Sequence, residues 1–194
     1  MGMPWSFLYP EAMNEVHTLL LKLGIPYQEF THSAVFTCEE SDRLCPPMPG
    51  SAHTKQLLMR DKKGTYHVLA IVMSDKKVDV KELGRTLQKK DLGFASPERL
   101  KRLLGVDPGS VTPFGLMFDH NHEVNVIVDE DAWAMGKFRF HPLVNTATLI
   151  IDRAGFETFL AHTRHEYRIM KIPKVGDRDE GIGGRLTPHA TANQ

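Results

Sequence analysis

The sequence predicts a mixed α/β domain of the α+β class. Helix start and stop signals alternate with short β-like runs, and two of these runs are joined by a segment typical of a hairpin turn. Helices interspersed with hairpins favour a mixed sheet over a doubly wound parallel sheet. A chain of 194 residues is long enough for one domain with a substantial core.

The first predicted elements are two helices with a strand between them. Apolar residues recur at helical spacing from about Glu11 to Leu23, and a Gly and a Pro follow as stop signals. Residues 27–32 have the pattern of a short strand. Thr37 and Glu40 match a capping box, which predicts that a short helix begins there.

A hairpin and a capped helix come next. Residues 57–60 and 66–73 are β-like runs, and the segment 61–64 between them is rich in turn-forming residues. Asp79 and Glu82 then open a helix that carries apolar residues on one side.

The following helix has the clearest bounds in the chain. Ser96 is a suitable cap, Pro97 occupies the first helical position and Gly105 comes directly after the end. Further along, residues 124–129 and 147–151 are predicted strands.

The last predicted elements are a helix and a strand. Asp152 can cap the helix, and residues 166–172 form the strand. Few apolar residues follow, which is typical of a disordered tail. We therefore expect three parts, which are an N-terminal extension at 1–10, one domain at 11–172 and a C-terminal tail at 173–194.

The composition excludes several classes of protein. Lys+Arg and Asp+Glu number 24 each, so the formal net charge is zero, which argues against a protein that coats nucleic acid non-specifically. The sequence contains no apolar stretch of the roughly 20 residues that span a bilayer, and no secretory signal pattern. Cys38 and Cys45 are too few for a disulfide framework. We expect a cytoplasmic protein with no membrane partner.

Charge is nevertheless concentrated in one part of the chain. Residues 55–102 hold 13 Lys/Arg and 6 Asp/Glu, a net charge of +7. Such charges commonly lie on solvated helix faces and turns. The alternative is a basic face that binds a polyanion of limited size while the rest of the surface repels it.

The common catalytic and metal-binding patterns are weak or absent. Nothing beside either cysteine marks it as an activated thiolate. The histidine pairs at 120/122 and 162/165 have no companion Cys or carboxylate at a recognised metal spacing. The sequence also contains no nucleophile elbow, P-loop or dinucleotide fingerprint. We expect neither a metal nor a cofactor.

Three segments remain as candidates for chemistry. Between Leu104 and His120 several glycines and prolines alternate, although an ordinary connection needs only one. Lys55 lies at the entry to a strand that otherwise reads as buried, where a lysine is commonly a snorkelling edge residue. His141-Pro142 breaks the chain ahead of Asn145 and an apolar strand, a pattern that by itself indicates a turn with polar caps.

Three ordered motifs resemble a known family. "HTKQLLMRDKKG", "GSVTPFGL" and "HPLVNTATLI" are similar in order and separation to the YbaK/ProX family of aminoacyl-tRNA deacylases. Among its members the freestanding ProX type, related to the editing domain inserted in bacterial prolyl-tRNA synthetases, is the most similar. The resemblance covers roughly residues 11–172. It implies a mixed sheet with helices packed around it and an ester-hydrolysing activity.

The resemblance also implies site residues. The implied catalytic residues are Lys55, Gly109 and His141. The implied substrate-binding residues are Gln56, Ser110, Val111, Thr112, Pro113, Gly115 and Asn145. Gln56 departs from the family pattern, in which Asn is common at this position, so the amide has a longer reach here.

The implied function is the editing in trans of mischarged tRNA. An aminoacyl ester is already reactive, so a positioned water and backbone N–H donors aimed at the developing oxyanion are sufficient for its hydrolysis. The ProX type implies alanyl-tRNA(Pro) as substrate, with the acceptor end of the tRNA and prolyl-tRNA synthetase as partners. Two alternatives stay open, which are a deacylase for cysteinyl- or another small aminoacyl-tRNA and a non-catalytic module that binds tRNA or a synthetase.

Overall fold

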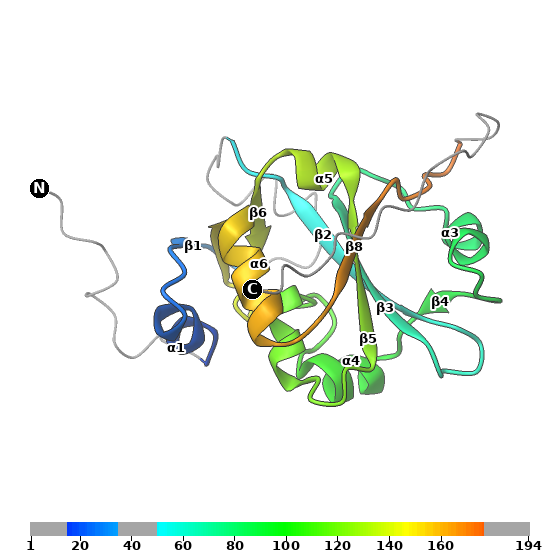
Figure 1. The fold of residues 1–194 in the computed structure, drawn as a ribbon, viewed down its shortest axis with the longest axis horizontal. Helices are drawn as coiled ribbons and strands as arrows, with labels where there is room; N and C mark the ends of the chain where they lie inside the picture. Colours follow the sequence, from blue (N-terminus) through cyan, green and yellow to red (C-terminus); the bar gives the residue numbers. More distant parts are fainter. Residues whose placement is uncertain (1–14, 35–49, 177–194) are drawn as a thin grey trace, which may run out of the picture.

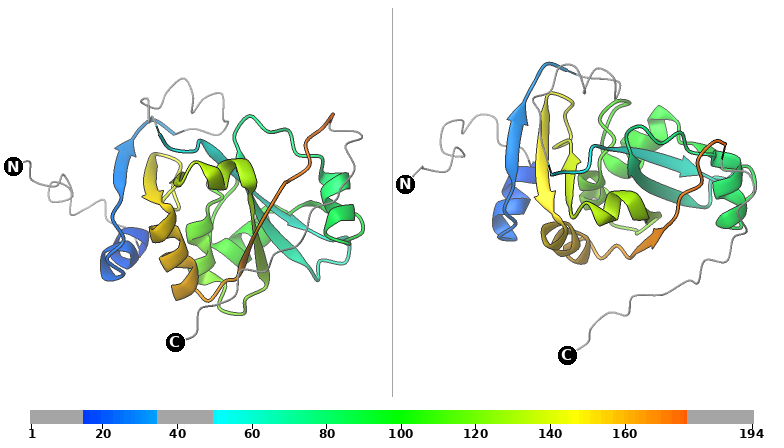
Figure 2. Two further views of the ribbon diagram at one scale, coloured as in Figure 1. Left: turned by 45° about the horizontal axis from the view of Figure 1, so that its top comes forward. Right: turned by 90° about the horizontal axis from the view of Figure 1, so that it is seen from above.

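The computed structural model describes residues 15–34 and 50–176, which form two β-sheets with helices around them (Figures 1 and 2). The predicted capping-box helix at Thr37, both cysteines and most of the predicted tail lie outside the described residues. The α+β fold class predicted from the sequence is confirmed. Among the described helices, none is long and apolar enough to cross a membrane.

The first described elements are α1 (Glu15–Lys22) and β1 (Gln28–Thr31), as the helical spacing and the short β-like run predicted. Leu20 is fully buried, and Leu23 packs against the same core. β1 pairs antiparallel with β7 (Ala147–Asp152), which places the first strand in the smaller sheet. That sheet has the order β1-β7-β6, with β6 at Lys137–Phe140.

The predicted hairpin is confirmed as β2 (Thr54–Arg60) and β3 (His67–Met73). β2 begins three residues earlier than the apolar pattern indicated, so Lys55 is part of the strand. Asp61 explains the turn, because its carboxylate accepts the backbone N–H groups of Thr65 and Tyr66.

Both capped helices are confirmed. Asp79 caps α3 (Val80–Thr86) through the N–H of Glu82, and Ser96 caps α4 (Pro97–Leu104). Between these helices β4 (Gly93–Phe94), which the sequence did not reveal, pairs with the end of β2.

The segment rich in glycine and proline allows two helices to pack very closely. It contains η3 (Pro113–Phe118), a 3-10 helix whose cap is Thr112. Gly105 ends α4 with φ +68°, and the ring of Phe118 lies against it. A Cβ atom on Gly115 would lie 2.6 Å from both the Cβ and the carbonyl oxygen of Leu104, so only glycine permits this contact.

The larger sheet mixes parallel and antiparallel strands. Its order is β4-β2-β3-β5-β8, and both the β3–β5 and the β5–β8 pairs are parallel. The sequence predicted β5 (Val124–Asp129), β7, α6 (Arg153–His162) and β8 (Tyr167–Met170). It missed α5 (Glu130–Ala134) and β6, and it gave no sign that the strands divide into two sheets.

The two sheets meet at β2 and β6. Ala52 and Phe138 form a parallel bridge, and the main core lies between one face of the larger sheet, the smaller sheet and the helices α4, η3, α5 and α6. A second, smaller core lies on the opposite face of the larger sheet, where Leu83 of α3 packs. Beyond Pro173 the chain still contacts the domain, since the N–H of Val175 donates to the carbonyl of Lys77.

We expect Gly115→Ala to destabilise the protein by about 1–3 kcal/mol, because backbone and Cβ atoms of Leu104 would have to move. Chemical denaturation followed by circular dichroism measures this free energy of unfolding. Gly93→Ala is the matched control, because a Cβ atom there would have no neighbouring atom within 4 Å and the backbone has no positive φ. Equal decreases of stability in the two variants would contradict the close approach of α4 and η3.

Candidate functional site

The glycine- and proline-rich loop exposes the turn at residues 107–109 and buries most of the residues that follow. Gly109 is exposed and has φ +91°, in the left-handed region that favours glycine. The N–H of Ser110 donates to the carbonyl of Asp107 at 3.1 Å, which closes the turn, and the Ser110 side chain is buried. Gly109 therefore lies at the exposed part of a turn that the bond between Ser110 and Asp107 closes.

Several residues predicted to bind substrate also give the loop its shape. The hydroxyl of Thr112 accepts the N–H of Phe114, and Thr112 is fully buried. Pro113 begins η3, and Gly115 packs against Leu104. Val111 is half-buried against the main core.

An aromatic cluster joins the loop to the strand that precedes His141. The ring of Phe114 meets Phe140 edge-on at 5.8 Å and Phe159 at 5.2 Å between centroids. All three rings are buried. Because Phe140 is the last residue of β6, its contact with Phe114 fixes the loop relative to His141.

The environment of His141 defines its protonation. Its Nδ1 lies 2.8 Å from the carbonyl oxygen of Ala147. A carbonyl can only accept, so Nδ1 carries the hydrogen and Nε2 of the neutral ring has a free lone pair. Burial lowers the pKa of His141; the bond to Ala147 acts in the opposite direction, and the charges of His32 and His53 lower the pKa further.

His32, which the sequence analysis did not select, lies beside His141, with 6.0 Å between ring centroids. Its Nδ1 lies 2.8 Å from the carbonyl oxygen of Ser33, and its Nε2 lies 2.9 Å from the hydroxyl of Thr148. The neutral ring that fits both partners donates to Ser33 and accepts from Thr148. Its only signal in the sequence is a polar residue at the end of a predicted strand.

The turn after His141 is held in a strained conformation. Leu143 has φ +68°, which costs a branched residue roughly 1–3 kcal/mol. Its side chain packs against the main core, and Pro142 is buried, so the surrounding contacts maintain the turn. Asn145 is half-buried in the same turn.

Lys55 and Gln56 point to opposite faces of the larger sheet, because side chains alternate along a strand. The Gln56 amide donates to the Thr54 hydroxyl at 2.7 Å, and this hydroxyl donates to the carbonyl of Arg139 at 3.1 Å. Gln56 is therefore linked through Thr54 to β6, the strand that leads to His141. Lys55 is on the other face.

The ammonium of Lys55 is positioned by the turn after β3. Its Nζ donates to the carbonyl of Ser74 at 2.7 Å. The same turn carries Lys76, whose Nζ contacts the fully buried carboxylate of Asp129 at 2.5 Å and Asp131 at 3.3 Å. Burial disfavours the charge of Lys76, but its bonds to the two carboxylates outweigh burial and raise its pKa. This ion pair fixes the turn that holds Lys55.

The histidine pairs noted in the sequence do not form a metal site with their neighbours. The His122 ring meets that of His165 at 5.1 Å between centroids, and Nε2 of His165 lies 3.1 Å from Asp119. Across residues 15–34 and 50–176, no group of three or more His, Cys, Asp and Glu side chains is arranged to hold a metal ion.

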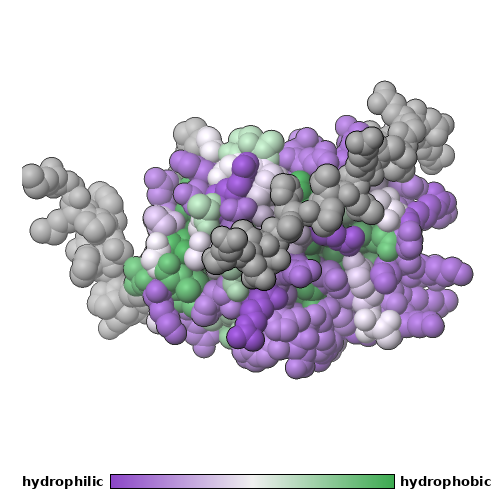
Figure 3. All heavy atoms as spheres, viewed as in Figure 1, coloured by the Kyte–Doolittle hydropathy of each residue, from purple (hydrophilic) through white to green (hydrophobic). Residues whose placement is uncertain are grey.

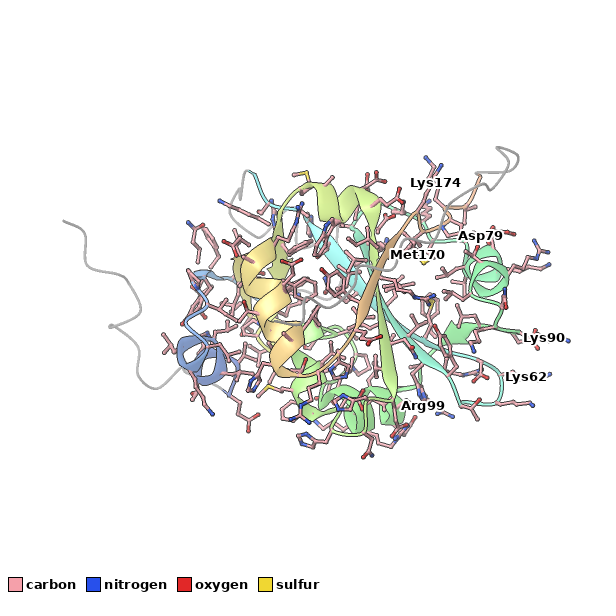
Figure 4. The ribbon with its side chains drawn as sticks, viewed as in Figure 1. Lys62, Asp79, Lys90, Arg99, Met170 and Lys174 are labelled. Atoms are coloured by element: carbon pink, nitrogen blue, oxygen red, sulfur yellow. The ribbon has the colours of Figure 1, made fainter. Side chains whose placement is uncertain are left out.

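Many cations of the basic window project at one end of the domain. Lys62 and Lys90 extend outward together from the β2–β3 hairpin and from the turn between α3 and β4 (Figure 4). The N–H of Lys62 lies 3.5 Å from the carbonyl of Lys90, which joins the two turns. This end of the molecule is mostly hydrophilic in Figure 3. Lys62 is also 3.9 Å from the carboxylate of Asp91, and Arg102 is paired with Glu123 at 2.8 Å.

Comparisons with known proteins agree on one family. The model of the aminoacyl-tRNA editing domain matches residues 32–159. The prolyl-tRNA editing protein ProX of Acetoanaerobium sticklandii is 29% identical over 162 residues, covering 84% of this chain and 98% of the relative. Prolyl-tRNA synthetase associated domain-containing protein 1 of Bos taurus is 31% identical over 159 residues, covering 80% of this chain and 92% of the relative.

A solved structure supports the same fold. The crystal structure of a proposed trans-editing enzyme for prolyl-tRNA synthetase superimposes with a TM-score of 0.59 at 18% identity. The match covers 84% of this chain and 99% of that chain.

We expect His141 to titrate with a midpoint below its ordinary pKa of 6.5, since burial disfavours the charged ring. The unfolded state then binds more protons than the folded state between the two pKa values. His141 therefore destabilises the fold as the pH decreases through that window. Proton NMR of the ring, assigned by comparison with His141→Gln, measures the midpoint directly. A midpoint at or above 6.5 would contradict the described environment.

Proposed function

Because the chain belongs to the aminoacyl-tRNA editing domain family and is a deacylase of that kind, we propose that it hydrolyses mischarged tRNA in trans, with alanyl-tRNA(Pro) as its main substrate. One observation carries the proposal: the family match spans Lys55, Gly109 and His141 together. The names of the relatives, which refer to prolyl-tRNA editing and to prolyl-tRNA synthetase, support the tRNA and the synthetase as partners.

The reaction needs no protein nucleophile. Water adds to the ester carbonyl, and the carbonyl oxygen becomes an oxyanion in the tetrahedral intermediate. The bond to the ribose oxygen then breaks, and a proton passes to that oxygen, which leaves free amino acid and tRNA. The protein accelerates these steps by placing the water and by stabilising the oxyanion.

Gly109 is the donor that we assign to the oxyanion. The N–H of Ser110 already donates to Asp107, whereas Gly109 lies at the exposed apex of the turn. A glycine has no side chain to keep the ester away from its backbone. The other loop residues act by shaping this turn: Ser110 closes it, Val111 packs beneath it, and it is fixed by Thr112, Pro113 and Gly115.

His141 acts through Nε2. Its Nδ1 hydrogen is directed to Ala147, so the neutral ring can accept a hydrogen bond from the attacking water. The lowered pKa keeps the ring neutral at neutral pH. The His32 ring lies beside the His141 ring, and Asn145 lies in the turn that follows His141.

Lys55 binds the sugar-phosphate end of the substrate. An ammonium has three donors, and the bond to Ser74 uses one of them. The remaining donors can bind a phosphate or ribose oxygen as a point charge. Gln56 lies on the other face of β2 and is linked to β6 through Thr54, which suits contact with the aminoacyl part.

We expect alanyl-tRNA(Pro) to be hydrolysed at least about 100-fold faster than prolyl-tRNA(Pro), because a site sized for alanine excludes the larger side chain by overlap. Single-turnover deacylation of a panel that includes alanyl-, cysteinyl-, seryl- and prolyl-tRNA(Pro) measures this preference. Faster hydrolysis of cysteinyl-tRNA would assign the enzyme to that substrate. A protein that binds tRNA and hydrolyses none of the panel would be a binding module.

We expect Lys55→Ala to lower single-turnover deacylation by roughly 10- to 150-fold, the value of one charge-assisted contact. Lys55→Arg should restore only part of the rate, because a planar fork differs in reach and direction from an ammonium. Lys171→Ala, at an exposed lysine after β8, is the control. If Lys55→Ala reacts at the parent rate with an unchanged melting temperature, Lys55 is only a structural edge residue.

A further inference from the structure

One edge of the larger sheet is open beside the candidate site. β4 pairs with Met59 and Arg60 only, and the N–H of Ala95 donates to the carbonyl of Leu58. In the part of the chain that the structure describes, no strand pairs along this edge from Lys55 to Leu57. Alternate residues direct their backbone groups to the same side, so the N–H and C=O of Gln56 face this open edge.

An exposed aromatic ring lies at the far end of the same edge. Phe94 is 60% exposed, although most large apolar side chains of the described residues are buried. It pairs directly with Met59, so its side chain is on the same face of the sheet as those of Lys55 and Leu57. Met59 follows Lys55 by about four strand positions, a distance of about 13 Å.

Cations surround the end of the edge that carries Phe94. The hairpin end at residues 60–66 and the turn at residues 88–92 contribute five cations and two carboxylates, a surplus of three positive charges. The cations are Arg60, Lys62, Lys63, Lys89 and Lys90. The Lys89 ammonium lies 4.3 Å from the centre of the Tyr66 ring, and Lys62 and Lys90 project into solvent (Figure 4).

We propose that this edge binds the single-stranded 3′ segment of the tRNA, with Phe94 as the stacking platform for one of its bases. Exposed aromatic rings beside cations are how proteins bind single-stranded nucleic acid, because every base has a face that can stack. The inference rests on the proposed function, in which Lys55, at one end of the open edge, binds the sugar-phosphate group nearest the ester. A distance of about 13 Å accommodates roughly four stacked nucleotides.

The binding experiment compares two RNAs, uncharged tRNA(Pro) and the same tRNA without its unpaired 3′ nucleotides. We expect Phe94→Ala to weaken binding of the intact tRNA about 5- to 150-fold and to leave binding of the shortened tRNA unchanged. Phe94→Trp should bind the intact tRNA as the parent does, whereas Phe94→Leu should not. Leu21→Ala is the control, because Leu21 is 54% exposed on α1, in a different part of the fold.

Fluorescence can detect directly whether a base of the tRNA stacks on Phe94. A 2-aminopurine base placed in the 3′ segment should become less fluorescent on binding the parent and stay fluorescent with Phe94→Ala. The double variant Lys62→Glu with Lys90→Glu should bind tRNA with a weaker dependence on salt. The slope of the logarithm of the binding constant against the logarithm of the salt concentration should become shallower by about 0.7 for each phosphate that the variant no longer neutralises. Lys22→Glu should leave this slope unchanged.

Three outcomes would overturn the inference. In the first, Phe94→Ala binds intact tRNA as tightly as the parent. In the second, it weakens both RNAs equally. In the third, the parent is a dimer that Phe94→Ala dissociates, which would assign the edge to a second copy of the chain. Hydrolysis by the parent protein is measured separately. If Phe94→Ala weakens binding of the intact tRNA but the parent hydrolyses no aminoacyl-tRNA, the proposed function is contradicted and the proposed tRNA-binding edge is supported.

Discussion

The packing of Phe114 between Phe140 and Phe159 holds together three parts of the chain that are far apart in sequence. Phe114 lies in the first turn of η3, Phe140 ends β6 and Phe159 is in α6, so this contact fixes the glycine-rich turn relative to the strand that leads to His141. The site that we propose needs a backbone donor from one of these segments and an imidazole from the other. Aromatic burial therefore provides the rigidity that a site built on loops requires.

Local signals in the sequence were sufficient for most helices and for the hairpin. Ser96 and Gly105 bound α4 because each satisfies terminal backbone groups within a few residues, and such contacts can be read directly from the chain. α5 was missed because it has only five residues and begins without a side-chain cap. The parallel pairing of β3 with β5 joins residues more than 50 positions apart, and no local pattern specifies it.

The sequence predicted residue types for the candidate site but not the geometry in which they lie. The motifs around Lys55, Gly109 and His141 identified the family, which the family model confirms. The sequence did not show that Thr112 is fully buried as a helix cap, because its hydroxyl could equally have faced a ligand. It also gave no reason to select His32, whose proximity to His141 depends on the pairing of β1 with β7.

The open edge of β2 has a consequence for solubility. An unpaired strand edge can add a strand from another molecule, and proteins usually protect such edges with charge, short length or a covering element. Here Lys55 is the only charged residue of the open stretch, and apolar Leu57 and Leu58 follow it. The ammonium that we propose to bind the substrate is thus also a charge that disfavours pairing of this edge with another molecule. A substitution that removes this charge would affect both substrate binding and aggregation.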